Sequence, residues 1–139
     1  MVALIVVDAS AILEMLFATP AGLRVAAKLN TSGSGSVGAS VIAAPQLLLI
    51  ECLQVLRRSV LRGDINEALA TELANDLFAL DLAFYDHELV AHRVWELRGN
   101  LTAYDATYVA LSELLHAPLL TNDAKLAAAP GNGATIEMC

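Results

Sequence analysis

Four acidic residues stand at positions where their carboxylates could meet at one site: Asp8, Glu51, Asp105 and Asp123. Asp8 directly follows the apolar run at 2–7, and Asp123 follows a second short apolar stretch. Asp105 lies in the predicted first turn of a helix, and Glu51 lies in the middle of the apolar helical stretch LLLIECLQVL. Carboxylates that meet at one rim repel each other, so they either take up protons or bind a hard cation.

Such a cluster would support hydrolysis with a bound metal. Oxygen ligands without a cysteine or histidine cluster favour Mg²⁺ or Mn²⁺ over zinc. One ion can lower the pKa of an attacking water, and a second ion, about 3.5–4 Å away, can neutralise the leaving oxygen of a phosphodiester. The four acids therefore predict a metal site suited to phosphodiester hydrolysis.

Three of the acids also have a purely structural explanation when each is taken alone. Asp8 could cap the N-terminus of the helix that follows it. Asp105 stands three residues after Thr102, which is the spacing of a capping-box variant. Asp123 could interact with the dipole of a short helix. The combination of acids, rather than any single one, indicates a functional site.

Glu51 is harder to explain as a structural residue. Its neighbours three and four positions away on the same helix face are mostly apolar, and Arg58 lies seven positions ahead. A buried charge without a partner is costly, and either an ion pair or a coordinated metal would remove that cost. The sequence leaves open whether Glu51 pairs with Arg58 or binds a metal.

The composition limits the classes of protein to which the chain can belong. Its 139 residues are 57% hydrophobic and 17% charged, which is typical of a well-packed globular chain, and we expect one domain over residues 1–139. No apolar run approaches the ~18 residues of a membrane span, and the N-terminus lacks the basic segment of a signal peptide. Cys52 and Cys139 fit neither a disulfide framework nor a zinc pattern, so we expect a cytoplasmic protein without a membrane partner.

The net charge of −7 and the pI near 4.7 argue against a general nucleic-acid binder. Such binding depends on Lys and Arg side chains that neutralise phosphates. If the substrate is a nucleic acid, something local must overcome the repulsion. Bound dications would do so, because they dominate the electric field around them.

Strands and helices alternate along the predicted chain, which implies an α/β fold with a central, mostly parallel sheet of 4–5 strands in a three-layer α/β/α arrangement. In such folds, sites form beyond the carboxyl ends of the strands, near the point where the strand order reverses. The predicted strands are Val2–Val7, Val41–Ala43, Leu80–Tyr85, Pro118–Thr121 and Thr135–Met138. The predicted helices are Ala9–Phe17, Pro20–Leu29, Pro45–Arg62, one that ends at Ala79, His87–Arg98, Ala103–His116 and a short helix after Asp123.

Several local features carry their own predictions. The Gly/Ser-rich stretch at 30–40 is typical of a flexible surface loop. Asp64 and Glu67, in the sequence DINE, predict a capping box for the helix that ends at Ala79. We expect Trp95 and one of the tyrosines that flank Asp105 to pack in the core.

Four stretches taken in order resemble PIN domains, and more closely the VapC ribonuclease toxins of type II toxin–antitoxin pairs: VVDASA, AAPQLLLIECLQVLRR, LTAYDATYVALSE and LLTNDAKLA. The resemblance covers essentially the whole chain. Four acidic motifs in this order and spacing are specific, whereas any single motif is weak. The Gly/Ser stretch at 30–40 is longer than the usual connection in this family, and it lies away from the acidic motifs.

The resemblance implies a parallel α/β/α sandwich and an endoribonuclease that depends on Mg²⁺ or Mn²⁺. Asp8 and Asp105 become the expected direct metal ligands, and Glu51 and Asp123 complete the site directly or through water. Thr121 matches the small hydroxyl residue that precedes the last acid by two positions, and it would hydrogen-bond Asp8 or an ordered water. Ser10 would support the site in the same way, although a helix-start role explains it more simply.

The resemblance also implies a VapB-type antitoxin, a homodimer and a toxin–antitoxin hetero-oligomer. We expect the antitoxin to insert a basic side chain, an arginine, into the carboxylates; the alternative is an apolar helix that merely blocks access. Lys125, Arg57 and Arg58 are candidate contacts for RNA phosphates. Their simpler roles are solvation and, for the arginines, interaction with a helix dipole.

Other functions stay open at this point. One is a PIN-type RNA-processing nuclease that is not a toxin, and another is a binding module in which the acids only cap helices. A receiver-type phosphoacceptor domain matches in part, because Asp86 follows the third predicted strand and Lys125 comes late in the chain. That alternative leaves Glu51 unexplained, and a phosphatase of the haloacid dehalogenase type would need an aspartate where Ser10 stands.

Overall fold

The core of the protein is a five-stranded sheet in which every neighbouring pair of strands is parallel. The computed structural model describes residues 3–33, 41–129 and 133–139. The strand order is β3-β2-β1-β4-β5, so the first strand lies at the centre. The predicted α/β fold with a mostly parallel sheet is therefore confirmed. The strands are β1 Leu4–Val7, β2 Val41–Pro45, β3 Ala83–Tyr85, β4 Leu119–Thr121 and β5 Ile136–Met138.

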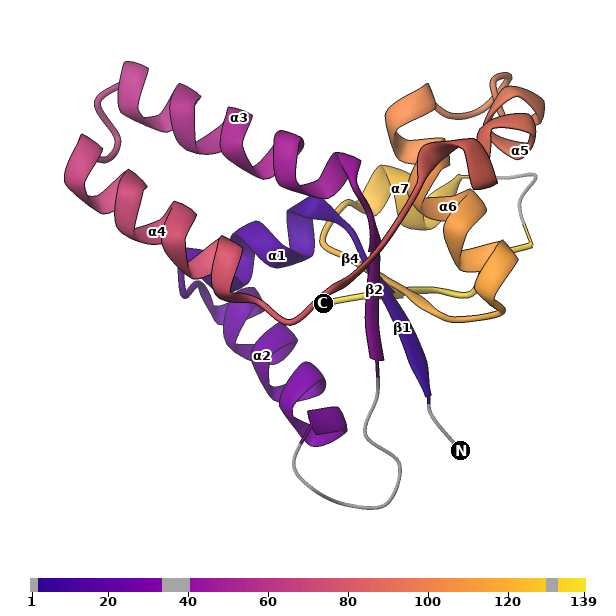
Figure 1. Cartoon of the computed structure of the whole chain (residues 1–139), viewed down its shortest axis with the longest axis horizontal. Helices are drawn as coiled ribbons and strands as arrows, with labels where there is room; N and C mark the ends of the chain where they lie inside the picture. Colours follow the sequence, from indigo (N-terminus) through magenta and orange to yellow (C-terminus); the bar gives the residue numbers. More distant parts are fainter. Residues whose placement is uncertain (1–2, 34–40, 130–132) are drawn as a thin grey trace.

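Helices cover both faces of the sheet (Figure 1). The first four helices lie on one side, and the later ones, from α5 onward, lie on the other. The helices α3 and α4 run side by side and extend away from the sheet (Figure 1). The helices are α1 Ala9–Leu16, α2 Pro20–Gly33, α3 Leu47–Leu61, α4 Glu67–Ala79, α5 Ala91–Glu96, α6 Ala103–Leu115 and α7 Ala124–Ala128, with a 3₁₀ turn at His87–Leu89.

The order of the strands creates a crevice between β1 and β4. From β1 the chain moves to β2 and β3 with its helices on one face, then returns to β4 and β5 with its helices on the other. Since parallel crossovers are right-handed, this reversal places α1 and α7 on opposite faces beyond two adjacent strand ends. The register pairs Val7 with Leu120, so Asp8 and Thr121 come next to each other at this edge.

The central strands are apolar because helices cover them on both sides. Val6 and Val7 of β1 and Leu119 and Leu120 of β4 are fully or almost fully buried. The helix α6 is buried continuously from Ala106 to Ser112, because the sheet packs on one side of it and α5 on another. The acids at the sheet edge therefore stand on rigid elements.

Four local predictions are wrong. The helix that ends at Ala79 is capped by Asn66, whose side chain accepts from the Leu69 N–H, rather than by an Asp64–Glu67 box. The predicted helix at 87–98 is interrupted at Val90 and becomes a 3₁₀ turn and a short helix. Trp95 is 68% exposed rather than in the core. The helix α2 continues through residue 33 into the predicted loop, and residues 34–40 lie outside the described part of the chain.

The helices α1 and α2 cross at a bend of 107°. Gly22 allows this approach, since a Cβ there would lie 1.9 Å from the carbonyl oxygen of Glu14. Among the described residues no single helix is long and apolar enough to cross a membrane. In the same described ranges, the bent pair Ala9–Leu16 and Pro20–Leu29 meets that criterion of length and composition when the two helices are taken together.

Candidate active site

The four predicted acids line one open cavity of about 420 Å³ at the carboxyl ends of β1 and β4. We call it the carboxylate cavity and define it by Asp8, Glu51, Asp105 and Asp123. The acids come from the β1–α1 connection, from α3, from α6 and from the β4–α7 connection, and they converge although they are far apart in the sequence. The rest of the wall is largely apolar.

Asp8 is the most firmly held of the four. Only 4% of it is exposed. Its Oδ1 accepts hydrogen bonds from Ser10 Oγ at 2.7 Å and from the Ala11 N–H at 3.0 Å, and its Oδ2 accepts from Thr121 Oγ1. Asp8 is thus the N-cap of α1 as well as a wall of the cavity, so its structural and functional explanations are compatible.

Two hydroxyl groups connect the ends of β1 and β4. Thr121 Oγ1 donates to Asp8 and accepts from the Asp123 N–H at 2.9 Å. Ser10 Oγ donates to Asp8 and accepts from the Asn122 N–H at 2.8 Å. Each hydroxyl therefore donates its proton to Asp8 and accepts a hydrogen bond from the backbone at residue 122 or 123.

Asp123 and Asp105 both lie at helix N-termini and are partly exposed to the cavity. Asp123 caps α7, because its Oδ1 accepts from the Lys125 N–H at 2.9 Å and, at 3.4 Å, from that of Leu126. The cap of α6 is Thr102, whose Oγ1 accepts from the Asp105 N–H at 3.2 Å. The contact between Thr102 and Asp105 that the spacing suggested is therefore present, and Asp105 lines the cavity as well.

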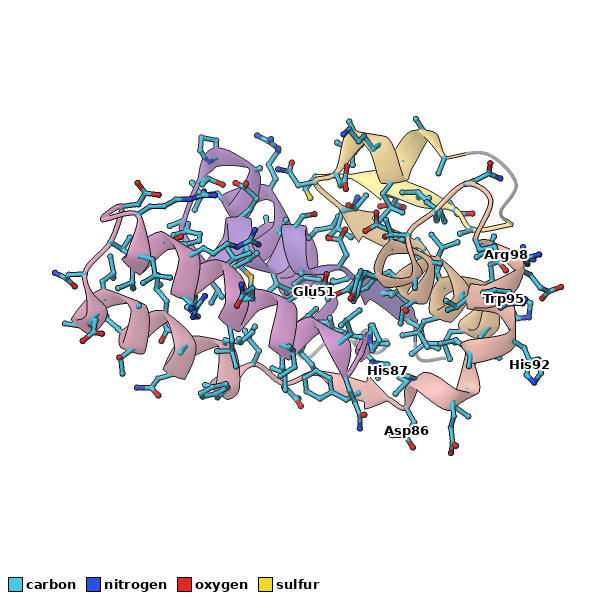
Figure 2. The ribbon with its side chains drawn as sticks, turned by 90° about the horizontal axis from the view of Figure 1, so that it is seen from above. Glu51, Asp86, His87, His92, Trp95 and Arg98 are labelled. Atoms are coloured by element: carbon cyan, nitrogen blue, oxygen red, sulfur yellow. The ribbon has the colours of Figure 1, made fainter. Side chains whose placement is uncertain are left out.

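Glu51 reaches the cavity from α3, and the ion pair with Arg58, one of the two alternatives that the sequence left open, is absent from the described residues. Instead, Glu51 Oε1 accepts a hydrogen bond from the hydroxyl of Tyr108 at 2.5 Å. Figure 2 shows Glu51 near the middle of the molecule, whereas Trp95, Arg98 and His92 stand at its outer edge.

Burial raises the pKa of three cavity carboxyls above their ordinary values. For Asp8, burial outweighs the hydrogen bonds from Thr121, Ser10 and Ala11, and the charge of Asp123 raises its pKa further. Burial likewise raises the pKa of Glu51 and Asp105, and neighbouring carboxylates add to both shifts. The cavity therefore concentrates negative charge that the described part of the protein does not neutralise with an ion pair.

The donor set suits a hard cation, because it consists of carboxylate oxygens without a thiolate or imidazole. The described residues nevertheless contain no group of three or more acidic, histidine or cysteine side chains placed closely enough to hold one ion together. An ion here would need water or substrate oxygens to complete its shell, as is usual for Mg²⁺.

The candidate RNA contacts separate into different places. Arg58 lines the carboxylate cavity, whereas Arg57, its neighbour on α3, lines a groove between α3 and α4. Lys125 is exposed, and its backbone N–H contacts Asp123. Of the three, Arg58 is the one placed to meet a group bound among the acids.

Two contributors to the site were not identified from the sequence. Tyr108 lies one helical turn after Asp105, and that spacing was the available signal that both share a face of α6. His87 Nε2 accepts from the Leu47 N–H at 2.9 Å and so caps α3, the helix that carries Glu51. The sequence has no signal for that contact, because β3 and its following turn bring His87 there.

Fold and site together define a parallel α/β protein with an acidic cavity at its topological switch point. Its sequence matches the PIN domain family over residues 5–132. It is 39% identical to Ribonuclease VapC1 of Mycobacterium tuberculosis over 127 residues, which is 91% of this chain and 90% of that protein. It is 32% identical to Ribonuclease VapC12 of the same species over 135 residues, which is 97% of this chain and 98% of that protein. The chain therefore belongs to the PIN-domain family and, within it, to the VapC group.

Solved structures show the same fold at lower identity. VapBC2 from Rickettsia felis, bound to a DNA fragment from its promoter, superposes with a TM-score of 0.70 at 15% identity and covers 97% of this chain and 98% of that one. Mycobacterium tuberculosis VapC20, described as a sarcin–ricin loop cleaving toxin, gives a TM-score of 0.64 at 18% identity. The match covers 89% of this chain and 93% of that one.

Proposed function

We propose that this protein is a metal-dependent endoribonuclease that acts as the toxin of a toxin–antitoxin pair. The observation that carries the proposal is the convergence of four carboxylates from distant parts of the chain on one cavity. Relatives named ribonucleases, at 32–39% identity over most of the chain, support the choice of RNA as substrate.

The proposed site uses the acids to bind Mg²⁺ or Mn²⁺. Asp8 and Asp105 are the proposed direct ligands, and Glu51 and Asp123 complete the site directly or through water. The bound ion would supply an activated water and neutralise charge on the scissile phosphate. Thr121 and Ser10 fix the orientation of Asp8, and Arg58 contacts a phosphate at the cavity wall.

The acidic surface is compatible with this activity because catalysis is local. A net charge of −7 predicts weak general affinity for RNA, with binding concentrated at the cation site and at Arg58. Single-stranded loops would then be favoured, because only unstacked nucleotides can enter a cavity of this size. The proposed location of the reaction is the cytoplasm.

A VapB-type antitoxin is the proposed partner, and the fold similarity to a protein crystallised as VapBC2 supports it. We expect its inhibitory segment to place an arginine among the four carboxylates, where the described protein supplies no ion-pair partner. A complex in which no cationic group approaches Asp8 or Asp105 would refute this arginine. A homodimer and a toxin–antitoxin hetero-oligomer belong to the same proposal.

The receiver-type alternative has little support in this structure. Asp86, the candidate phosphoacceptor, accepts from the Gln46 side chain at 3.0 Å and does not belong to the cavity wall. A PIN-type nuclease that is not a toxin is distinguished by growth: a toxin arrests cells when it is expressed alone, and its antitoxin restores growth.

The test is cleavage of a structured RNA by antitoxin-free protein with Mg²⁺, with Mn²⁺ or with EDTA. Asp105→Asn is compared with Asp64→Asn, which changes an exposed acid outside the cavity. We expect cleavage that needs metal, is lost in Asp105→Asn and persists in Asp64→Asn. Cleavage in EDTA, or equal cleavage by both variants, would overturn the proposal.

A further inference from the structure

The hydroxyl of Tyr108 is a polar group in the site that the mechanism above does not use. Tyr108 is 2% exposed and lies in the continuously buried part of α6. Its ring packs in the core, yet its oxygen reaches across to α3 and donates to Glu51 Oε1 at 2.5 Å. A phenylalanine would fill the same apolar space, so core packing does not explain the hydroxyl.

Glu51 needs such a partner. It is flanked by apolar side chains on α3, and the described structure gives it no ion pair. A glutamate side chain has several rotatable bonds and loses considerable entropy when it is fixed. One short hydrogen bond from a rigid aromatic ring fixes the carboxylate at the cavity wall and leaves Oε2 for another ligand.

The direction of this hydrogen bond suits the two groups. A tyrosine hydroxyl can donate one proton, and a carboxylate oxygen accepts. The contact between Tyr108 and Glu51 Oε1 therefore uses the donor that phenylalanine would lack.

We propose that Tyr108 is a positioning residue that holds Glu51 in place for the divalent cation. This inference rests on the proposed metal site. Asp105 and Tyr108 lie three residues apart on α6, so this helix supplies one acid directly and orients a second, which α3 carries. Losing a hydrogen-bond partner that orients a metal ligand typically weakens metal binding or activity about 10–100-fold.

The experiment measures Mn²⁺ affinity of the intact protein by paramagnetic resonance or calorimetry, without RNA. Tyr108→Phe is compared with wild type and with Tyr85→Phe, which removes a tyrosine hydroxyl outside the cavity wall. We expect Tyr108→Phe to weaken Mn²⁺ binding about tenfold or more, and Tyr85→Phe to leave it unchanged. Equal affinity of Tyr108→Phe and wild type would overturn the positioning role.

Repeating the change in a Glu51→Ala variant separates a positioning role of Tyr108 from a general loss of packing. In Glu51→Ala the hydroxyl of Tyr108 has no carboxylate to hold, so adding Tyr108→Phe should not change Mn²⁺ affinity further. The same loss in both backgrounds would mean a structural role and would refute the inference. Failure of wild type to bind Mn²⁺ would instead refute the metal site itself, so the two failures are distinguishable.

Discussion

Carboxylates in two regions of this molecule have opposite environments. In the carboxylate cavity, burial raises the pKa of Asp8, Glu51 and Asp105, and no cation of the described protein pairs with them. Near the other end of α6, Glu113 accepts from Arg93 Nε at 2.7 Å and Nη2 at 3.2 Å, and this guanidinium holds the pKa of Glu113 below its ordinary value.

The difference separates acids that the fold neutralises from acids that it leaves for a ligand. Glu113 joins α5 to α6 and also accepts from the Gly133 N–H at 2.9 Å, so its charge is used inside the protein. The cavity acids carry a cost that an external cation would remove. An acid that destabilises its own protein is better evidence for a ligand site than an acid in an ion pair.

The largest expected effect comes from replacing a carboxylate of the cavity with the corresponding amide. Asp8→Asn should lower RNA cleavage more than about 100-fold, since it removes a proposed direct ligand rather than a supporting contact. The same change should alter the melting temperature of the metal-free protein little, because the loss of the buried charge is offset by the loss of an acceptor for the Thr121 hydroxyl.

Glu113→Gln is the matched change outside the cavity. It should leave cleavage intact and lower the free energy of unfolding by about 1 kcal/mol or less, since the pair is partly exposed and screened by water. Cleavage assays and melting curves in EDTA measure both variants. If both changes shift activity and stability in the same direction, the contrast between the regions is wrong.

A smaller effect is expected at Thr121, whose hydroxyl contacts both Asp8 and the backbone of Asp123. Thr121 is fully buried, and Thr121→Val leaves Asp8 Oδ2 and the Asp123 N–H without their partner. We expect about 1–3 kcal/mol of lost stability and about tenfold weaker cleavage.

Thr107→Val is the control for this change. Thr107 is also buried, but its hydroxyl donates only to Ala103 O within α6, at 2.7 Å. Its cleavage rate should match wild type. Equal kinetic losses in the two variants would show that Thr121 supports folding rather than the orientation of Asp8.

Adjacent arginines give the next test. Arg58 lines the carboxylate cavity and Arg57 lines the α3–α4 groove. Arg58→Gln should raise KM for RNA about fivefold with little change in kcat, because it removes the proposed phosphate contact. Arg57→Gln should leave KM unchanged, and a similar rise in both variants would indicate general attraction by positive charge.

The smallest effect is a pH dependence of opposite sign in the two regions. An acid with a raised pKa binds more protons when folded, so the metal-free protein should lose stability as pH rises from about 4 toward neutrality. The pKa of Glu113 is lowered in the folded protein. Its contribution to the free energy of unfolding is therefore fully present above the ordinary pKa of 4.5, and it is lost as the pH falls through the lowered pKa.

Urea unfolding at several pH values, with EDTA or with Mg²⁺, measures this prediction. Mg²⁺ should stabilise the protein near neutrality and have a smaller effect near pH 4, where protons compete with the ion for the carboxylates. Stabilisation by Mg²⁺ that does not vary with pH would contradict the assignment of the ion to these carboxylates.

The parts that the sequence could predict are those that depend on short stretches and on general rules for parallel sheets. Asp8 and Asp123 follow apolar strands, and strand ends meet at one edge, so their convergence could be expected. Glu51 could be flagged because a charge in an apolar helix needs an explanation. The roles of these acids in metal binding stay predictions.

The parts that could not be predicted depend on how elements pack. The contact between Tyr108 and Glu51 joins two helices whose relative position is fixed by the sheet between them. Trp95 is exposed because α5 is short and ends at Glu96, while the guanidinium of Arg98 covers the ring at 4.4 Å from its centre. An apolar residue type alone did not reveal which face of that helix would be covered.

The central position of β1 has a consequence for how the protein is made. The residue that holds Asp8 from the neighbouring strand, Thr121, is 113 positions later in the chain. A growing polypeptide therefore contains Asp8 long before Thr121, and it cannot complete the cavity until β4 has been synthesised and has paired with β1. The proposed catalytic site therefore depends on a pairing between distant segments of the chain, and no fragment that ends before β4 can contain it.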